Sequence, residues 1–364
     1  MQNKEFESAL KVNQGIEQPP IVNPYLSNFY KKNRSKLLSE DQYIDGIIAG
    51  DTSILSQAIT LVESSRSDHR IMAQKLITRC LTHAVKSMRI GITGVPGAGK
   101  STFIESFGGL ITAKGHKLAV LAIDPSSEKS KGSILGDKTR METLCNDPNV
   151  FIRPSPSSGS LGGVAQKTRE STILCEAAGY DVIFIETVGV GQSETAVHSM
   201  SDFFLLLMLA GAGDELQGIK RGIMEMSDLI AITKADGNNV KKATLAKALY
   251  KNALHLFPPT ESGWIPTALT TSAITKQGLE EVLEKIEEYF KLVQETGHYL
   301  EKRREQSRFW MYETIQEDLK NHFFENKAVK ENILGYENKV LRGEISSFAA
   351  ANKLMDLYIS KKQK

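Results

Sequence analysis

Short apolar runs alternate with longer stretches of helical periodicity through the middle of the chain. Six such runs stand out in order: MRIGIT, KLAVLAID, DVIFIE, FFLLLML, LIAIT and PTALTTS. Runs that are apolar throughout, rather than at every second residue, are typical of strands buried on both faces of a parallel sheet. We therefore predict that residues 88–297 form one doubly wound, mostly parallel α/β domain.

Less regular segments flank this predicted domain. Residues 1–38 contain EQPPIVNPY, which discourages regular structure, and are interpreted as an N-terminal extension. Residues 39–87 are predicted to be helical, with an apolar stripe that runs from Met72 to Val85. Residues 298–364 are charged and helical in pattern, without a sustained heptad repeat. Their expected apolar anchors are Val329, Ile333, Val340, Leu341, Phe348, Leu354, Leu357 and Tyr358.

Composition and charge narrow the class of protein. The 364 residues are 41% hydrophobic, which is enough for a sizeable core. Forty-five basic and 43 acidic residues leave a net charge of +2, so no general attraction to nucleic acid or anionic membranes is expected. No apolar run reaches the roughly 18 residues of a membrane span, and three scattered cysteines are typical of a reducing compartment. We therefore expect a cytoplasmic protein without a nucleic-acid or membrane partner.

A phosphate-binding loop follows the first apolar run. GVPGAGKST fits the pattern G-x-x-x-x-G-K-[ST], with a predicted strand before it and a predicted helix after it. The glycines let backbone N–H groups turn toward phosphate oxygens, and the helix adds its positive end. Lys100 is expected to neutralise the β- and γ-phosphates, and Ser101 to ligate Mg²⁺. The predicted nucleotide contacts are Gly94, Gly97, Ala98, Gly99, Lys100, Ser101 and Thr102.

Acidic residues follow two further predicted strands. Glu186 ends DVIFIE, where a carboxylate on a neighbouring parallel strand can reach Mg²⁺ and the γ-phosphate, and Gly189 would offer its N–H to that phosphate. Asp124 and Asp137 lie in AIDPSS and GSILGDKTRM, in one loop region after a strand. The residues alone leave two interpretations of these aspartates open: ligands of Mg²⁺ or water in a switch segment, or solvated loop acids.

The segment ITKADG favours guanine as the base. An aspartate at position 236 can accept hydrogen bonds from N1–H and the 2-amino group of guanine, which adenine does not offer. Thr233 stands where the general GTPase signature has Asn, and Lys234 follows it. Alone, so short a motif is equally typical of an ordinary turn; its position after the phosphate loop favours base recognition. Ser272 and Ala273 are expected to touch guanine O6 through their backbone.

Together these motifs resemble one family. In chain order they are GVPGAGKST, DPSS, GSILGDKTRM, RPSPSSGSLGGVAQKTRE, ETVGVGQSE, GAGDELQGIKRGI and TKADG. Over approximately residues 40–295 the set resembles the MeaB/ArgK group of P-loop GTPases, which includes the mitochondrial MMAA protein. The resemblance implies a SIMIBI-type G domain, GTP or GDP and Mg²⁺ as cofactors, and a chaperone role toward adenosylcobalamin-dependent methylmalonyl-CoA mutase or a related acyl-CoA mutase.

The resemblance also implies roles for segments that chemistry alone does not assign. The region around Asp137 would be a first switch, residues 186–194 a second, and residues 211–220 a third that couples nucleotide state to the mutase. The candidate couplers are Asp214, Glu215, Gln217 and Lys220. From the residues alone, this third segment is interpreted as a helix N-terminus with an acidic first turn. The C-terminal helices would form a homodimerisation arm, and RPSPSSGSLGG would be a fixed element rather than a linker.

Hydrolysis by the isolated protein is predicted to be slow. Many small GTPases carry a water-orienting glutamine after the second-switch glycine, whereas this chain has Val190 there and Gln192 two residues further on. Three alternatives remain: a P-loop kinase or ATPase linked to transport, a nickel-insertion GTPase, and a nucleotide-regulated scaffold. The nickel alternative needs His or Cys clusters that the sequence does not contain.

Overall fold

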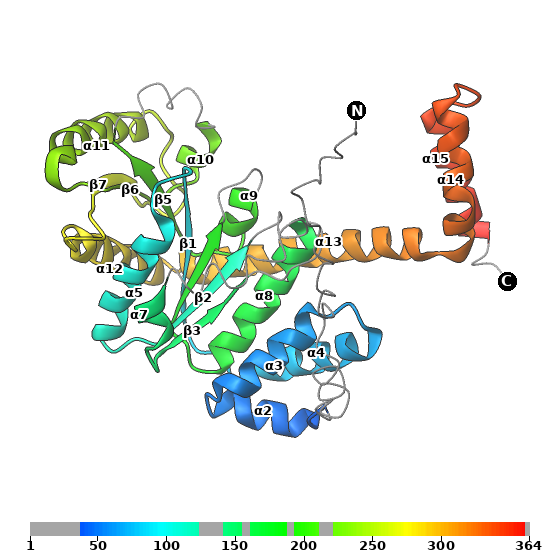
Figure 1. Ribbon diagram of the computed structural model, residues 1–364, viewed down its shortest axis with the longest axis horizontal. Helices are drawn as coiled ribbons and strands as arrows, with labels where there is room; N and C mark the ends of the chain where they lie inside the picture. The colour runs from blue at the N-terminus through cyan, green and yellow to red at the C-terminus, as the bar shows by residue number, and fades with distance from the viewer. Residues whose placement is uncertain (1–36, 124–140, 155–160, 188–192, 211–220, 361–364) are drawn as a thin grey trace, which may run out of the picture. The chain divides into compact units, whose positions relative to one another are not determined.

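Seven parallel strands form the central sheet of the protein (Figure 1). The computed structural model describes residues 37–123, 141–154, 161–187, 193–210 and 221–360. The strands lie in the order β3-β2-β4-β1-β5-β6-β7. Their bounds are β1 Met88–Gly94, β2 Leu118–Ile123, β3 Val150–Arg153, β4 Val182–Thr187, β5 Phe203–Leu209, β6 Leu229–Thr233 and β7 Thr267–Thr270. The predicted doubly wound α/β class is confirmed.

All six predicted apolar runs are strands, but the sheet has a seventh strand that the pattern did not indicate. This strand, β3, has four residues and pairs only with β2, at one edge of the sheet. An edge strand is less enclosed by its neighbours than a central strand, so fewer of its side chains need to be apolar. Its hydrophobic pattern is therefore weaker.

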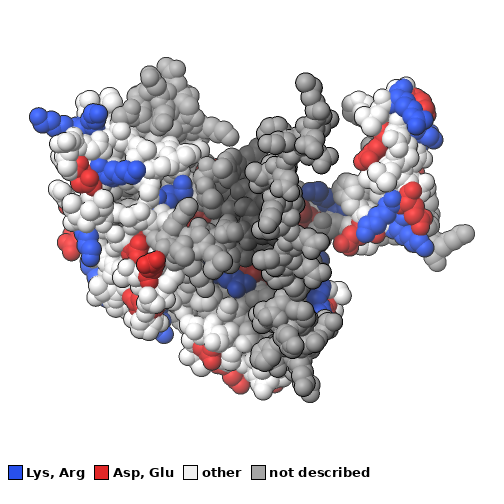
Figure 2. Space-filling model, viewed as in Figure 1, with Lys and Arg blue, Asp and Glu red and all other residues white. Residues whose placement is uncertain are grey.

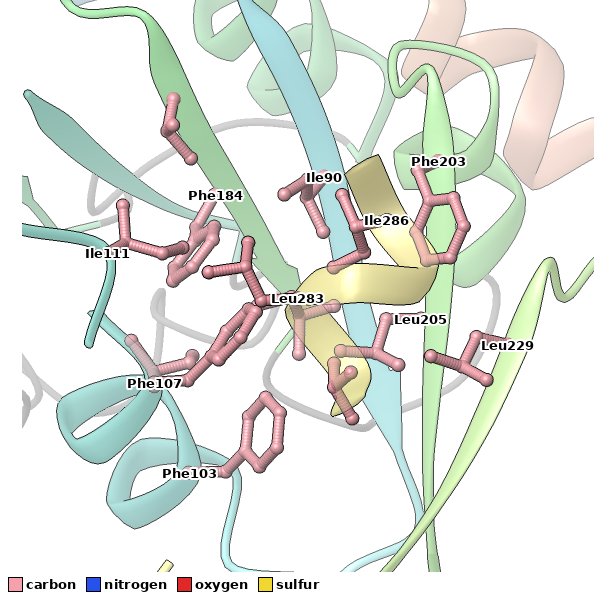
Figure 3. Packing of buried hydrophobic residues seen from close by; sticks show 14 of the residues in the cluster. Ile90, Phe103, Phe107, Ile111, Phe184, Phe203, Leu205, Leu229, Leu283 and Ile286 are labelled. Carbon is pink, nitrogen blue, oxygen red and sulfur yellow. The ribbon is translucent and has the colours of Figure 1, made fainter. Parts of the chain in front are cut away.

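Helices cover both faces of the sheet. On β5, Leu205 and Leu207 join a core cluster that includes residues of α5 (Lys100–Ala113) and α12 (Leu279–Glu295), as Figure 3 shows for part of this cluster. The alternate residues Leu206 and Met208 join a second cluster with α11 (Val240–Leu254). Side chains alternate across a strand, so these clusters lie on opposite faces. Further elements are α7 (Glu142–Cys145), α8 (Leu161–Ala177), α9 (Ser193–His198), α10 (Arg221–Glu225) and η1 (Gly237–Asn239).

From residue 37 on, where the described part of the chain begins, three short helices precede the sheet: α2 (Glu40–Ile48), α3 (Thr52–Glu63) and α4 (Ser67–Cys80). The predicted apolar stripe is correct up to Cys80, where α4 ends. Beyond it the prediction is wrong, because Leu81 and Val85 lie outside the helix and are exposed. The helical spacing of apolar residues in the sequence continues beyond Cys80, although the helix itself ends there.

Buried charged residues hold the first part of helix α13 (His298–Glu325) against the sheet. Arg303 donates to Asp202 through Nη2 and Nε, at 2.7 and 3.0 Å, and its Nη1 lies 3.3 Å from Glu176. Arg89 pairs with Glu176 through two bonds of 2.8 Å, and Ser87 donates to the same carboxylate. We call these five residues the basal cluster. Arg303 lies on α13, and the other four lie at the amino ends of β1 and β5 and at the end of α8.

Two further helices, α14 (Lys327–Leu341) and α15 (Ser347–Ser360), follow α13 and contact each other. Val329 and Leu354 are buried, as predicted. Leu341 and Phe348 are not: they are 83% and 81% exposed, so their prediction as anchors is wrong for this single chain. Periodicity identifies the apolar face of a helix but not what covers it.

Basic and acidic side chains are interspersed over the described part of the face in Figure 2. Among the helices that the structure describes, none is long and apolar enough to cross a membrane.

Candidate nucleotide-binding site

The loop between β1 and α5 has the backbone that its glycines predict. Residues 95–98 form a β-turn in which the Ala98 N–H donates to the Val95 carbonyl at 3.1 Å. Pro96 fixes a negative φ and Gly97 has φ +80°, which is the pattern of a type II turn. At Gly94, a Cβ atom would lie 2.5 Å from the Leu207 carbonyl oxygen of β5, so only glycine allows this approach.

Lys100 begins α5 and folds back over the loop. Its Nζ donates to the Gly94 carbonyl at 3.0 Å. Burial lowers the pKa of Lys100, while the nearby carboxylates of Glu186 and Glu194 act in the opposite direction. The next residue, Ser101, is half-buried, and Thr102 is exposed. The loop therefore presents a cation and a hydroxyl at the N-terminal end of a helix.

Glu186 lies beside this loop on β4. In the sheet register it stands next to Ile92 of β1 and Ala122 of β2, and it is 6% exposed. One residue further on, the Thr187 hydroxyl is 2.8 Å from that of Thr93, which joins β4 to β1 at this edge. The carboxyl ends of neighbouring parallel strands thus bring Glu186 close to the phosphate loop.

The donor chemistry of the described residues fits Mg²⁺. Glu186 and Ser101 offer carboxylate and hydroxyl oxygens, and Mg²⁺ takes one or two such protein ligands together with water and nucleotide phosphates. Within the described ranges there is no group of three or more His, Cys, Asp or Glu residues that could hold a metal.

The predicted base-binding residues follow β6 and β7. Asp236 precedes η1, and one of its carboxylate oxygens accepts from the Ser272 hydroxyl at 2.5 Å. The Thr275 N–H donates to the same hydroxyl oxygen at 3.1 Å. Lys234 is exposed with φ +55°, and the Asn239 side chain donates to its carbonyl at 2.7 Å. The two loops therefore share hydrogen bonds that hold Asp236 in place.

Two hydrogen bonds tie these loops to the phosphate loop and its helix. The Thr233 hydroxyl lies 2.8 Å from the Ala98 carbonyl, and Ser106 of α5 donates to the Ala273 carbonyl at 2.8 Å. Sequence reasoning did not find Ser106, Thr275 or Asn239. The one sequence clue near these contacts was Thr233, which stands where the general GTPase signature has Asn.

Seven predicted residues lie outside the described residues, so the structure does not place them: Asp124, Asp137, Gly189, Asp214, Glu215, Gln217 and Lys220. The predicted residues that the structure does describe lie together at one end of the sheet. Gly94 to Thr102, Glu186, Thr233 to Asp236, and Ser272 with Ala273 all follow or end strands at the carboxyl edge of the sheet.

The second predicted switch leads into α9, which ends with the half-buried His198. Its ring packs edge-on against Phe204, with the centroids 5.4 Å apart. Burial, assisted by the charge of Lys302, lowers the pKa of His198 to about 4. Imidazole is therefore the neutral form in the folded protein at pH 7.

This pKa predicts how stability changes with pH. Between pH 6.5 and about 4 the unfolded chain binds a proton at His198 that the folded chain does not, so this residue makes stability fall as pH falls. At pH 4 the loss approaches about 3 kcal/mol. We expect His198→Leu to reduce the slope of unfolding free energy against pH, measured by urea denaturation. His255→Leu, at an exposed histidine, should keep the wild-type slope; equal slopes in all three proteins would contradict the prediction.

Comparisons with known proteins identify the family of the chain. A family model described as methylmalonyl Co-A mutase-associated GTPase MeaB matches residues 55–328. The chain is similar to the GTPase ArgK of Escherichia coli, with 45% identity over 80% of this chain and 89% of that protein. It is equally similar to the mitochondrial methylmalonic aciduria type A homolog of Mus musculus, with 45% identity over 88% of this chain and 80% of that protein.

A solved structure shows the same fold. The crystal structure of an LAO/AO transport system kinase superposes with a TM-score of 0.69 and 35% identity, covering 88% of this chain and 99% of that chain. The phosphate loop, the carboxylate beside it and the family match lead to one conclusion. The chain belongs to the MeaB family of methylmalonyl-CoA mutase-associated GTPases.

Proposed function

We propose that this GTPase uses the state of its bound nucleotide to gate the loading or protection of adenosylcobalamin on methylmalonyl-CoA mutase or a related acyl-CoA mutase. The observation that carries the proposal is the convergence of the phosphate loop, Glu186 and Asp236 at one edge of the sheet. The family description, which names a mutase-associated GTPase, supports the choice of client.

In this proposal the chain's own residues divide the work on GTP. Lys100 neutralises charge on the β- and γ-phosphates, and the N–H groups at the start of α5 bind phosphate oxygens. Ser101, Glu186, Asp124 and Asp137 would hold Mg²⁺, which would supply positive charge to offset the charge that develops on the phosphate. Gly189 offers its N–H to the γ-phosphate. The reaction is attack of water on that phosphate, which yields GDP and free phosphate.

Base selection is assigned to Asp236, positioned by Ser272. We expect Asp236→Asn to lower the preference for GTP over ATP at least about tenfold, because an amide cannot accept two hydrogen bonds from guanine as a carboxylate does. Calorimetric titration with a nonhydrolysable analogue of each nucleotide measures the preference. Glu261→Gln removes an exposed carboxylate elsewhere and should leave the preference unchanged. Retained selectivity in Asp236→Asn would remove this residue from the role.

Coupling to the client is assigned to the third predicted switch, residues 211–220. The isolated protein should release phosphate slowly in single-turnover assays, and added methylmalonyl-CoA mutase should accelerate the release. Lys220→Ala is expected to keep GTP affinity and the slow rate but to lose the acceleration. Fast release without the mutase would refute slow intrinsic hydrolysis, and no response to the mutase would refute the client assignment.

We also propose that the C-terminal helices form a homodimer. The support is the number of large apolar side chains that this single chain leaves exposed along α13 to α15, including Leu319, Leu334, Leu341 and Phe348. Sedimentation of the full chain against a truncation after Glu325 tests the proposal: a dimer that becomes a monomer supports it. The cut must lie beyond the first half of α13, since Arg303 and Trp310 bond to the nucleotide domain.

A kinase remains the second candidate, because the solved relative carries that description. The products separate the two functions. A kinase transfers the γ-phosphate to an acceptor, whereas a GTPase releases it as free phosphate.

A further inference from the structure

Three side chains of α13 bond to the segment that joins α9 to β5. They donate to backbone carbonyls, in the pairs Lys302 Nζ to Asp202 at 2.6 Å, Gln306 Nε2 to Ser201 at 2.9 Å, and Trp310 Nε1 to Ser199 at 3.2 Å. The donors are spaced four residues apart, so they lie along one face of the helix. We call these three donors the α13 clamp. Their acceptors follow the chain back from the start of β5 to the end of α9.

The α13 clamp supplies donors that α9 cannot supply itself. Carbonyl groups at and beyond the end of a helix have no donor within it. Ser199 is the first residue after α9, and the Trp310 side chain bonds to its carbonyl. Trp310 and Gln306 are both buried. Because a buried polar group without a partner is costly, the end of α9 can shift only if α13 shifts with it or these bonds break.

A second side of α9 rests directly on the sheet. At Gly91 of β1, a Cβ atom would lie 2.8 Å from Val197 Cγ1 of α9 and 2.8 Å from the Ser201 Oγ, so both pack against the bare backbone of the strand. Val197 is fully buried in this contact region. A densely packed interior transmits a displacement rather than absorbing it. We therefore expect a displacement of α9 to be taken up on the side of α13.

The first turn of α9 lies near the nucleotide site. The helix begins at Ser193, within the predicted second switch. Glu194, in that turn, is close enough to Lys100 for its charge to oppose the lowering of the Lys100 pKa by burial. One end of α9 is thus within electrostatic reach of the phosphate-loop cation, and the other end is bonded to α13.

We propose that the α13 clamp couples the second switch to the C-terminal helices, so that α13 lies differently on the sheet when GTP is bound than when GDP is bound. The inference rests on the proposed function and adds a route by which the nucleotide state leaves the nucleotide domain. Beyond Trp310, α13 continues to Glu325, and α14 follows and contacts it. Gln306 and Trp310 are then positioning residues for α9. Such coupling is reciprocal, so a change in the clamp also changes nucleotide affinity.

The first test observes the clamp directly. The chain has two tryptophans, and Trp264→Phe leaves Trp310 as the only one. Indole emission depends on the surroundings of the ring, which here include the Ser199 carbonyl and the Arg169 guanidinium, 5.3 Å from the ring centroid. We expect the emission of this variant to differ between its complexes with GDP and with a nonhydrolysable GTP analogue in Mg²⁺. Identical emission from the two complexes would overturn the inference.

A second measurement guards against damage from this replacement, because Trp264 is part of the core cluster. The emission of Trp310→Phe, which retains Trp264, is subtracted from that of the wild type in each complex. A remainder that depends on the nucleotide supports the inference, and a remainder that does not counts against it.

The second test compares bonds of the same kind on the same helix. Gln306→Met and Trp310→Phe each remove one bond of the clamp. The matched control, Tyr299→Phe, removes the 2.9 Å bond from the Tyr299 hydroxyl to the Ser87 carbonyl, at the amino end of β1. Calorimetric titration in Mg²⁺ gives the affinity of each full-length variant for GDP and for the GTP analogue. The two clamp variants should change the ratio of these affinities about three- to tenfold, the range for one hydrogen bond, and the control less than about twofold.

This ratio separates coupling from a structural role. Loss of a buried bond should lower the urea midpoint of all three variants, but a purely structural loss has no reason to favour one nucleotide over the other. An unchanged ratio in both clamp variants, or an equal change in Tyr299→Phe, would refute the coupling.

Failure of the proposed function would look different. Phosphate release that does not respond to methylmalonyl-CoA mutase would refute the client, and a preference for adenine nucleotides would refute the role of Asp236. Both tests of the clamp use the full chain without the mutase. They apply equally to whichever nucleoside triphosphate and diphosphate the protein binds.

Discussion

Lys100→Ala is expected to lower the rate of GTP hydrolysis at least about a hundredfold and to weaken binding of GTP more than of GDP. The physical reason is the loss of the cation that the loop holds above its own backbone, 3.0 Å from the Gly94 carbonyl. A charge placed in a partly buried site stabilises developing phosphate charge far more than one in water. Single-turnover phosphate release and calorimetric titration measure the two effects.

A matched control removes the lysine at the opposite end of α5. Lys114 is exposed at the end of α5, far along the helix from the loop, and Lys114→Ala should hydrolyse GTP at the wild-type rate. Hydrolysis within about threefold of the wild type in Lys100→Ala would remove Lys100 from the reaction. If that variant lost hydrolysis but still bound and protected the mutase, the scaffold interpretation would be favoured over the gate.

Arg303→Ala is expected to lower the free energy of unfolding by about 3–5 kcal/mol, the range for removing one partner from a buried ion pair. The carboxylates of Asp202 and Glu176 are each 2% exposed and would lose a shared cation. Burial acts to raise the pKa of Asp202, but the charges of Arg303 and Arg89 outweigh it, so the pKa lies below its usual value. The urea midpoint measures the loss.

The neighbouring Arg304 provides the control. It is exposed, and Arg304→Ala should change stability by less than about 0.5 kcal/mol. Arg303→Lys should lose less stability than Arg303→Ala and more than Arg304→Ala. Its ammonium group cannot replace the planar guanidinium that bonds to two carboxylates. A loss below about 1 kcal/mol in Arg303→Ala would mean that the basal cluster does not hold α13 to the sheet.

Local patterns were sufficient to predict most of the fold and part of the site. Six strands, the phosphate loop and Glu186 are each encoded within about ten consecutive residues, where periodicity and glycine spacing are informative. The contacts that complete the site are not local. Ser272 and Asp236 are 36 residues apart, and Arg303 and Glu176 are 127 apart. A local sequence pattern therefore does not include both partners of either contact.

Other errors have equally physical causes. The four-residue strand β3 is too short to show a hydrophobic period. Leu341 and Phe348 are apolar, as buried anchors are, but nothing in the single chain buries them. An apolar helix face is consistent with burial inside the chain or against another copy, and sequence alone does not separate the two.

The basal cluster and the phosphate loop lie at opposite ends of the strands of one sheet. The basal cluster lies at the amino ends of the strands and the phosphate loop at a carboxyl end, with β1, seven residues long, between them. A strand of that length spans about 20 Å, beyond the range at which mutational effects usually interact. Nucleotide present at a hundred times its dissociation constant adds about 2.7 kcal/mol to stability. Bound nucleotide would therefore offset part, but not all, of the stability that a change in the basal cluster removes.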